Sequence, residues 1–144
     1  MAHAHTPRLA RRTVAFLALA YLIAWALMVA AFWLTPDRSG SMAFGYALFV
    51  IWLVMPVLTF AVSAAAGRLV EGAAAWVVIP ALGVMFMLLP YVTYSLANTL
   101  SFGNVHVPDA RDFLVGAVCS AAGVLLGRVL AARRLRAAAP SHSA

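Results

Sequence analysis

Three long stretches of this chain contain no charged side chain, and this feature limits the possible folds more than any other. They are residues 13–34, 42–66 and 73–97. Each has at least the roughly 20 residues that an α-helix needs to cross the hydrocarbon core of a bilayer. A fourth apolar stretch, residues 109–130, carries charged side chains only near its two ends. The pattern therefore predicts four transmembrane helices.

The composition excludes both a soluble globular domain and a disordered chain. Of the 144 residues, 65% are hydrophobic and 10% are charged, and the mean hydropathy is +0.97. An ordinary soluble domain is about half apolar and about a quarter charged, and a short chain leaves a large share of its surface exposed. Disorder requires the opposite composition. We therefore expect an all-α integral membrane protein whose main partner is the lipid bilayer.

Short polar segments separate the four apolar stretches, which predicts an up-down-up-down four-helix bundle. The links include residues 35–41 and 67–72, both rich in residues that break helices. The transmembrane domain is expected over residues 13–132. Basic tails, residues 1–12 and 133–144, are expected on either side of it, the second of them flexible.

The basic residues predict the orientation in the membrane. All ten are arginines, and eight fall on the side that holds both tails and the 67–72 link. These eight are Arg8, Arg11, Arg12, Arg68, Arg128, Arg133, Arg134 and Arg136. Because cytoplasmic segments carry the excess of positive charge, both termini are predicted to be cytoplasmic. This explanation of the charge requires no nucleic acid as a partner. The alanine-rich, lysine-free composition is typical of a genome of high GC content, and we expect a bacterial protein of the plasma or inner membrane.

The first apolar stretch has the features of a retained helix rather than a signal peptide. Ala24-Trp25-Ala26 loosely fits a cleavage site, but the apolar core of a signal peptide spans only about 7–15 residues. This stretch continues to Leu34 and ends in Phe32-Trp33, a pair suited to the membrane interface.

Small residues recur at spacings of three and four along the fourth stretch, on one side of the expected helix. They are Gly116, Cys119, Ser120, Gly123 and Gly127, and the last two form a GxxxG pair. Small residues let helix backbones approach closely in lipid. We expect them to form a packing interface, either within the chain or, as the alternative, with another subunit.

Three prolines interrupt the second and third stretches. Pro56, Pro80 and Pro90 each remove a backbone donor, which predicts a kink and an unpaired carbonyl four residues earlier. That carbonyl needs another partner in lipid. Thr59 and Ser63 share a helix face with Pro56, so their hydroxyls are candidates for bonds across helices or to the backbone.

The polar end of the third stretch is the best candidate for a ligand site. Tyr91, Tyr94 and Asn98 share one face of the expected helix. Tyrosines at this depth also act as interfacial anchors, so binding of a small molecule or lipid headgroup is a hypothesis beside that simpler role.

The following loop contains residues that could bind a metal ion in other settings. His106, Asp109 and Asp112 are three residues apart, but Pro108 and the start of a helix lie between them. Both aspartates suit the first turn of that helix, with Asp109 as its N-cap. We therefore expect no metal site and no cofactor.

The function expected from the sequence is non-enzymatic. No ionisable side chain lies deep within a span, where such groups usually mark proton or ion pathways. The single cysteine, Cys119, cannot form a disulfide within one chain. We expect an accessory or assembly component that packs against itself or a larger membrane protein. The first alternative is a transporter or channel subunit for a neutral or amphipathic solute, and the second is a lipid-acting enzyme using His106 and Asp109.

Overall fold

The computed structural model of the protein describes residues 6–35, 41–70 and 72–138. The side chains of Arg8 and Arg11 lie outside this description, as do the outer ends of both predicted tails. Every regular element within the described ranges is a helix. The all-α prediction is therefore confirmed.

The helices join end to end into four long rods. The first rod is the single helix α1 (Thr6–Leu34), and the fourth is the single helix α6 (Ala110–Ala138). The second rod consists of α2 (Ser41–Tyr46), η1 (Ala47–Val54) and α3 (Met55–Leu69). The third rod consists of η2 (Gly72–Val77), α4 (Val78–Pro90), η3 (Tyr91–Ser95) and α5 (Leu96–Phe102). Each rod is long and apolar enough to cross a membrane. Four candidate spans of this kind suggest a multi-pass membrane protein.

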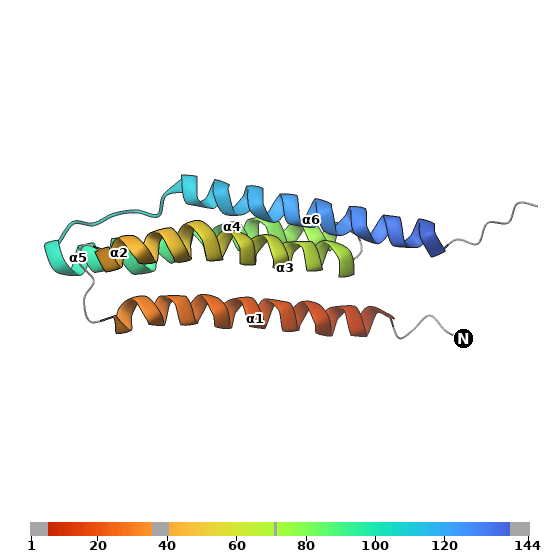
Figure 1. Ribbon diagram of the computed structural model, residues 1–144, viewed down its shortest axis with the longest axis horizontal. Coiled ribbons are helices and arrows are strands. Elements are labelled where there is room, and N and C mark those ends of the chain that lie inside the picture. Colours follow the sequence, from red (N-terminus) through yellow and green to blue (C-terminus); the bar gives the residue numbers. More distant parts are fainter. Residues whose placement is uncertain (1–5, 36–40, 71, 139–144) are drawn as a thin grey trace, which may run out of the picture.

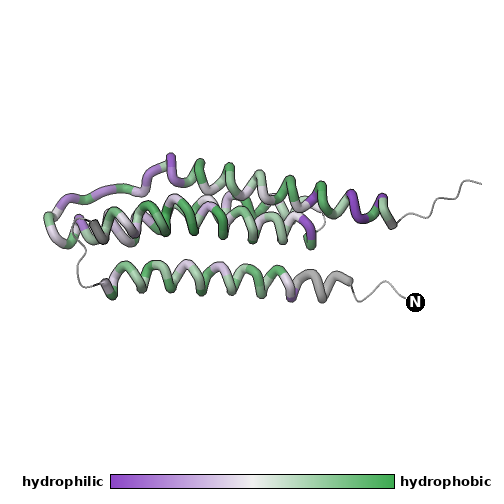
Figure 2. Tube along the Cα trace, in the orientation of Figure 1, coloured by the Kyte–Doolittle hydropathy of each residue, from purple (hydrophilic) through white to green (hydrophobic). Residues whose placement is uncertain are grey.

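Consecutive rods run in opposite directions, so α1 begins at the end of the molecule where α6 finishes (Figure 1). This is the predicted up-down-up-down order. Hydrophilic residues gather toward the two ends of the molecule and hydrophobic residues along its middle (Figure 2). Such a distribution suits two aqueous surfaces separated by lipid.

The helices α3, α4 and α6 form the tightest part of the bundle, while α1 lies alongside α3 (Figure 1). Met55, Phe86 and Leu89 are almost fully buried in the centre. From α1, Tyr21 joins the same cluster. The bundle is therefore a three-helix core with a fourth helix attached by its larger side chains.

The helices extend beyond the apolar stretches that predict them. The first begins at Thr6 and the last continues to Ala138, because alanine and arginine favour the helix even outside an apolar segment. The third rod continues to Phe102. It ends at Gly103, whose positive φ of 72° and N–H bond to the Thr99 carbonyl, at 2.9 Å, form a helix C-cap.

All three prolines lie where one helix type gives way to another. Pro56 follows the π-helical η1, Pro80 lies in the first turn of α4 after the 3₁₀ segment η2, and Pro90 precedes the π-helical η3. Proline has no N–H and its ring crowds the preceding turn, so it interrupts regular α-helical hydrogen bonding at these junctions. Near Pro90, the buried hydroxyl of Thr93 donates to the Leu89 carbonyl at 2.7 Å.

Candidate functional site: the packing seam and the two polar ends

The glycines of α6 face backbone and core atoms of the same chain. A Cβ on Gly123 would lie 2.5 Å from the carbonyl oxygen of Phe60, and one on Gly116 would lie 2.5 Å from the Cβ of Phe86. Gly127 leaves even less space beside α3. The small-residue stripe therefore packs against α3 and α4 within the chain, and its glycines are not left free for a second subunit.

Polar side chains form hydrogen bonds across the same seam. Ser63 of α3 and Ser120 of α6 are fully buried, and their hydroxyl oxygens lie 2.7 Å apart. The Thr59 hydroxyl lies 3.2 Å from that of Tyr21 on α1. Cys119 is half-buried beside Ser120. Within the described residues, no buried side-chain nitrogen or oxygen lacks a partner, so the seam is a completed polar contact between helices.

An aromatic cluster closes the bundle near the end at which α1 finishes. The ring centroids of Phe32 and Tyr94 are 5.0 Å apart, and those of Phe32 and Tyr46 are 5.2 Å apart. The Tyr94 hydroxyl donates to the carbonyl of Ala43, while Trp33 donates to a backbone carbonyl of η3 at 3.1 Å. Tyr94, a candidate ligand residue in the sequence, is therefore occupied in joining the second and third rods.

Two further hydrogen bonds, donated by aromatic side chains to backbone carbonyls, join α1 to its neighbours. The sequence does not predict them. Trp25 donates from Nε1 to the Met85 carbonyl at 3.0 Å, and Tyr46 donates to the Met28 carbonyl at 2.8 Å. The available signal is the placement of Tyr21 and Trp25 on one face of α1, four residues apart. Spacing cannot identify the acceptors, because they are backbone groups of distant segments.

The remaining candidate ligand residues have separate environments. Tyr91 is half-buried at the start of η3. Asn98 lies in α5, and its Nδ2 is 3.3 Å from the Nδ1 of His106 in the loop that follows. That histidine nitrogen is also 3.1 Å from the Asn104 carbonyl. Tyr94 and Asn98 therefore have hydrogen-bond partners within the chain, and a ligand site at Tyr91, Tyr94 and Asn98 stays a prediction.

The loop residues considered for metal binding also remain apart. Asp109 accepts a hydrogen bond from the backbone N–H of Arg111 at 2.9 Å, which confirms its predicted role as the N-cap of α6. Across the part of the chain that the structure describes, no three potential metal-ligating side chains come together. His106 bonds within its own loop, so it shows no pairing with Asp109.

Most of the arginines lie at the opposite end of the molecule, where α1 begins, α3 ends and α6 finishes. The last turns of α6 are strongly hydrophilic there (Figure 2). Those with described side chains are Arg12, Arg68, Arg128, Arg133, Arg134 and Arg136. Arg128 is the most enclosed, since it donates to the Gly72 carbonyl and lies 5.0 Å from the centre of the Trp76 ring. The two ends thus differ in charge, as the sequence predicts.

The chain matches no protein-family profile, no curated protein and no solved structure. Its function must therefore be inferred from the contacts within the chain and from the surfaces that these contacts leave exposed.

Proposed function

We propose that the protein is a non-enzymatic accessory or assembly component of the plasma or inner membrane, with both termini cytoplasmic. It would act by packing against a larger membrane protein or a second copy of itself. The orientation is supported by the arginines gathered at the end that holds both described termini. Because the seam glycines are already used within the chain, the partner would contact another surface.

The observation that carries this proposal is the unequal burial of the four spans. In α1, only 6% of the most apolar 18-residue stretch is buried, against 22–28% in the other three. Helices in lipid associate through close packing, since lipid is as apolar as the side chains themselves. The outer surface of α1 includes the exposed small residues Ala20, Ala26 and Ala31 among large apolar ones. These residues offer space for the backbone of another helix.

Photocrosslinking in native membranes tests this proposal. We expect a photoreactive side chain at Ile23, which is 52% exposed on α1, to form protein adducts. The matched control is Leu125, which is equally exposed on α6, and it should react mainly with lipid. An adduct of twice the chain mass would identify a second copy as the partner. Absence of protein adducts at Ile23, or equal adducts at both positions, would contradict the proposal.

A transporter or channel subunit for a neutral solute is the second candidate function. It is favoured by the π-helical segments η1 and η3 beside Pro56 and Pro90, because such segments frequently occur at functional sites. This candidate requires water to reach the buried hydroxyls of Ser63 or Thr93. Reagent access to these positions therefore distinguishes the two functions.

A further inference from the structure

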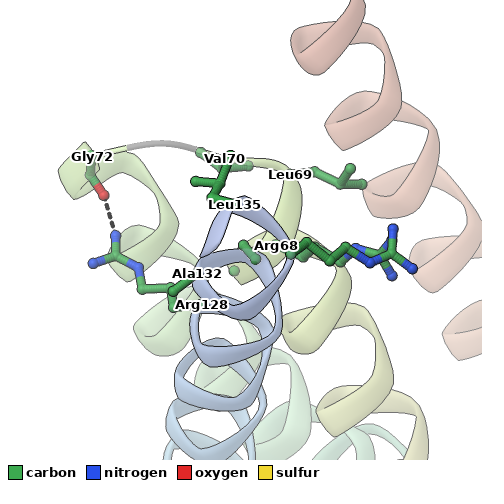
Figure 3. Close-up of a pocket in the computed structure, with 10 residues that line it drawn as sticks. Arg68, Leu69, Val70, Gly72, Arg128, Ala132 and Leu135 are labelled. Atoms are coloured by element: carbon green, nitrogen blue, oxygen red, sulfur yellow. Dashed lines mark hydrogen bonds between the residues drawn. The ribbon is translucent and has the colours of Figure 1, made fainter. Parts of the chain in front are cut away.

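The basic end of the bundle contains a cleft of about 600 Å³ between the end of α3 and the last turns of α6 (Figure 3). Its lining combines the arginines Arg68, Arg128 and Arg134 with aliphatic side chains that include Leu69 and Leu135. Guanidinium groups bind phosphate through paired N–H donors. A lining of this kind suits a ligand with an anionic headgroup and an apolar tail.

Arg128 forms a fixed wall of the cleft. It donates one hydrogen bond to the Gly72 carbonyl (Figure 3) and lies against the ring of Trp76. Gly72 has a positive φ of 72°, which lets the chain turn between the second and third rods. A guanidinium has five N–H donors, so Arg128 keeps donors for an anion while its position is held.

The other cations lie on exposed parts of the cleft. Arg68 extends away from Arg128 toward the side of α1 (Figure 3), and Arg134 lies in the last turns of α6. Among the described residues, none of those that line the cleft carries a carboxylate. The nearest acidic residue in sequence is Glu71, which lies outside the described residues. The described lining of the cleft therefore has a net positive charge.

The cleft lies just beyond the apolar parts of α3 and α6, at the level where lipid headgroups surround a helix that spans a bilayer. Arg68 is the penultimate residue of α3, and Arg134 follows the uncharged part of α6. Exposed apolar side chains continue from this level along α6, including Leu126 and Leu130. We propose that the cleft binds the phosphate group of an anionic phospholipid, whose acyl chains lie along the bundle.

Native mass spectrometry of the full chain from neutral detergent tests this proposal. We expect wild-type protein to retain phosphatidylglycerol more tightly than phosphatidylcholine with the same acyl chains. Removing both exposed charges, Arg68→Gln with Arg134→Gln, should weaken phosphatidylglycerol binding about 25-fold, at about fivefold for each arginine.

Arg136→Gln is the matched control, because Arg136 is exposed on the same helix but does not line the cleft. The affinity of the Arg136→Gln variant for phosphatidylglycerol should change little. If the double variant unfolds, Arg134→Gln alone is measured instead, and it should give an intermediate loss of affinity. Equal losses with Arg136→Gln and Arg134→Gln would overturn the proposal in favour of general attraction between charges. Displacement of the lipid by excess inorganic phosphate would overturn the lipid assignment and identify free phosphate as the ligand.

Discussion

Gly127→Leu is expected to separate α6 from α3 and to destabilise the bundle by about 3 kcal/mol or more, the upper part of the range for overpacking. A Cβ at this position would meet the carbonyl of Ala64 and the backbone nitrogen of Arg68. Both are main-chain atoms, so no change of side-chain rotamer relieves the overlap. Unfolding with a denaturing detergent, followed by tryptophan fluorescence, measures the loss.

Gly45→Leu is the control for this change. Gly45 also lies in a helix, but a Cβ there has no atom within 4 Å. Because leucine favours the helix more than glycine does, this variant should be as stable as wild type or up to about 1 kcal/mol more stable. Similar stabilities of the two variants would show that α3 and α6 are not held together at Gly127.

Cysteines at Ser63 and Thr93 are expected to remain unlabelled by water-soluble thiol reagents in native membranes. Both positions are fully buried, and a thiol in apolar surroundings forms little of the reactive thiolate. The experiment uses a Cys119→Ala background, so that each protein contains one thiol. Val105→Cys, at a loop position that is 83% exposed, should be labelled completely over the same time.

The opposite labelling result would change the functional conclusion. If Ser63→Cys or Thr93→Cys reacts at a rate comparable to that of Val105→Cys, water enters the bundle beside the proline junctions. The transport function would then replace the accessory function as the better proposal. Sealed positions together with protein adducts at Ile23 would support the accessory function instead.

The existence and order of the four spans are predictable from the sequence because length and apolar character alone determine which segments can cross a bilayer. The helix ends are less predictable. The fourth apolar stretch ends near residue 130, whereas α6 continues to Ala138. Its last turns consist largely of alanine and arginine, which favour the helix. At Gly103, by contrast, a residue able to adopt positive φ marks the end of the third rod.

The sequence also predicts that one face of α6 serves for packing, but not which helices it contacts. Spacing places Gly116, Ser120 and Gly123 on one side, whereas their contacts with Phe86, Ser63 and Phe60 depend on long-range folding. The contacts of Tyr94 are unpredictable for the same reason. The neighbours of Tyr94 come from the first and second rods, which no local pattern places beside it.

That the chain crosses the bilayer along α6 is tested by measuring which side of the membrane each end of this helix reaches. Cysteines are placed singly at Val105 and Ala137, which precede and follow the core of this helix, in the Cys119→Ala background. Intact cells are then treated with a membrane-impermeant thiol reagent. We expect labelling of Val105→Cys in intact cells and of Ala137→Cys only after the membrane is opened. Equal labelling of both positions in intact cells would contradict a chain that crosses the bilayer between them.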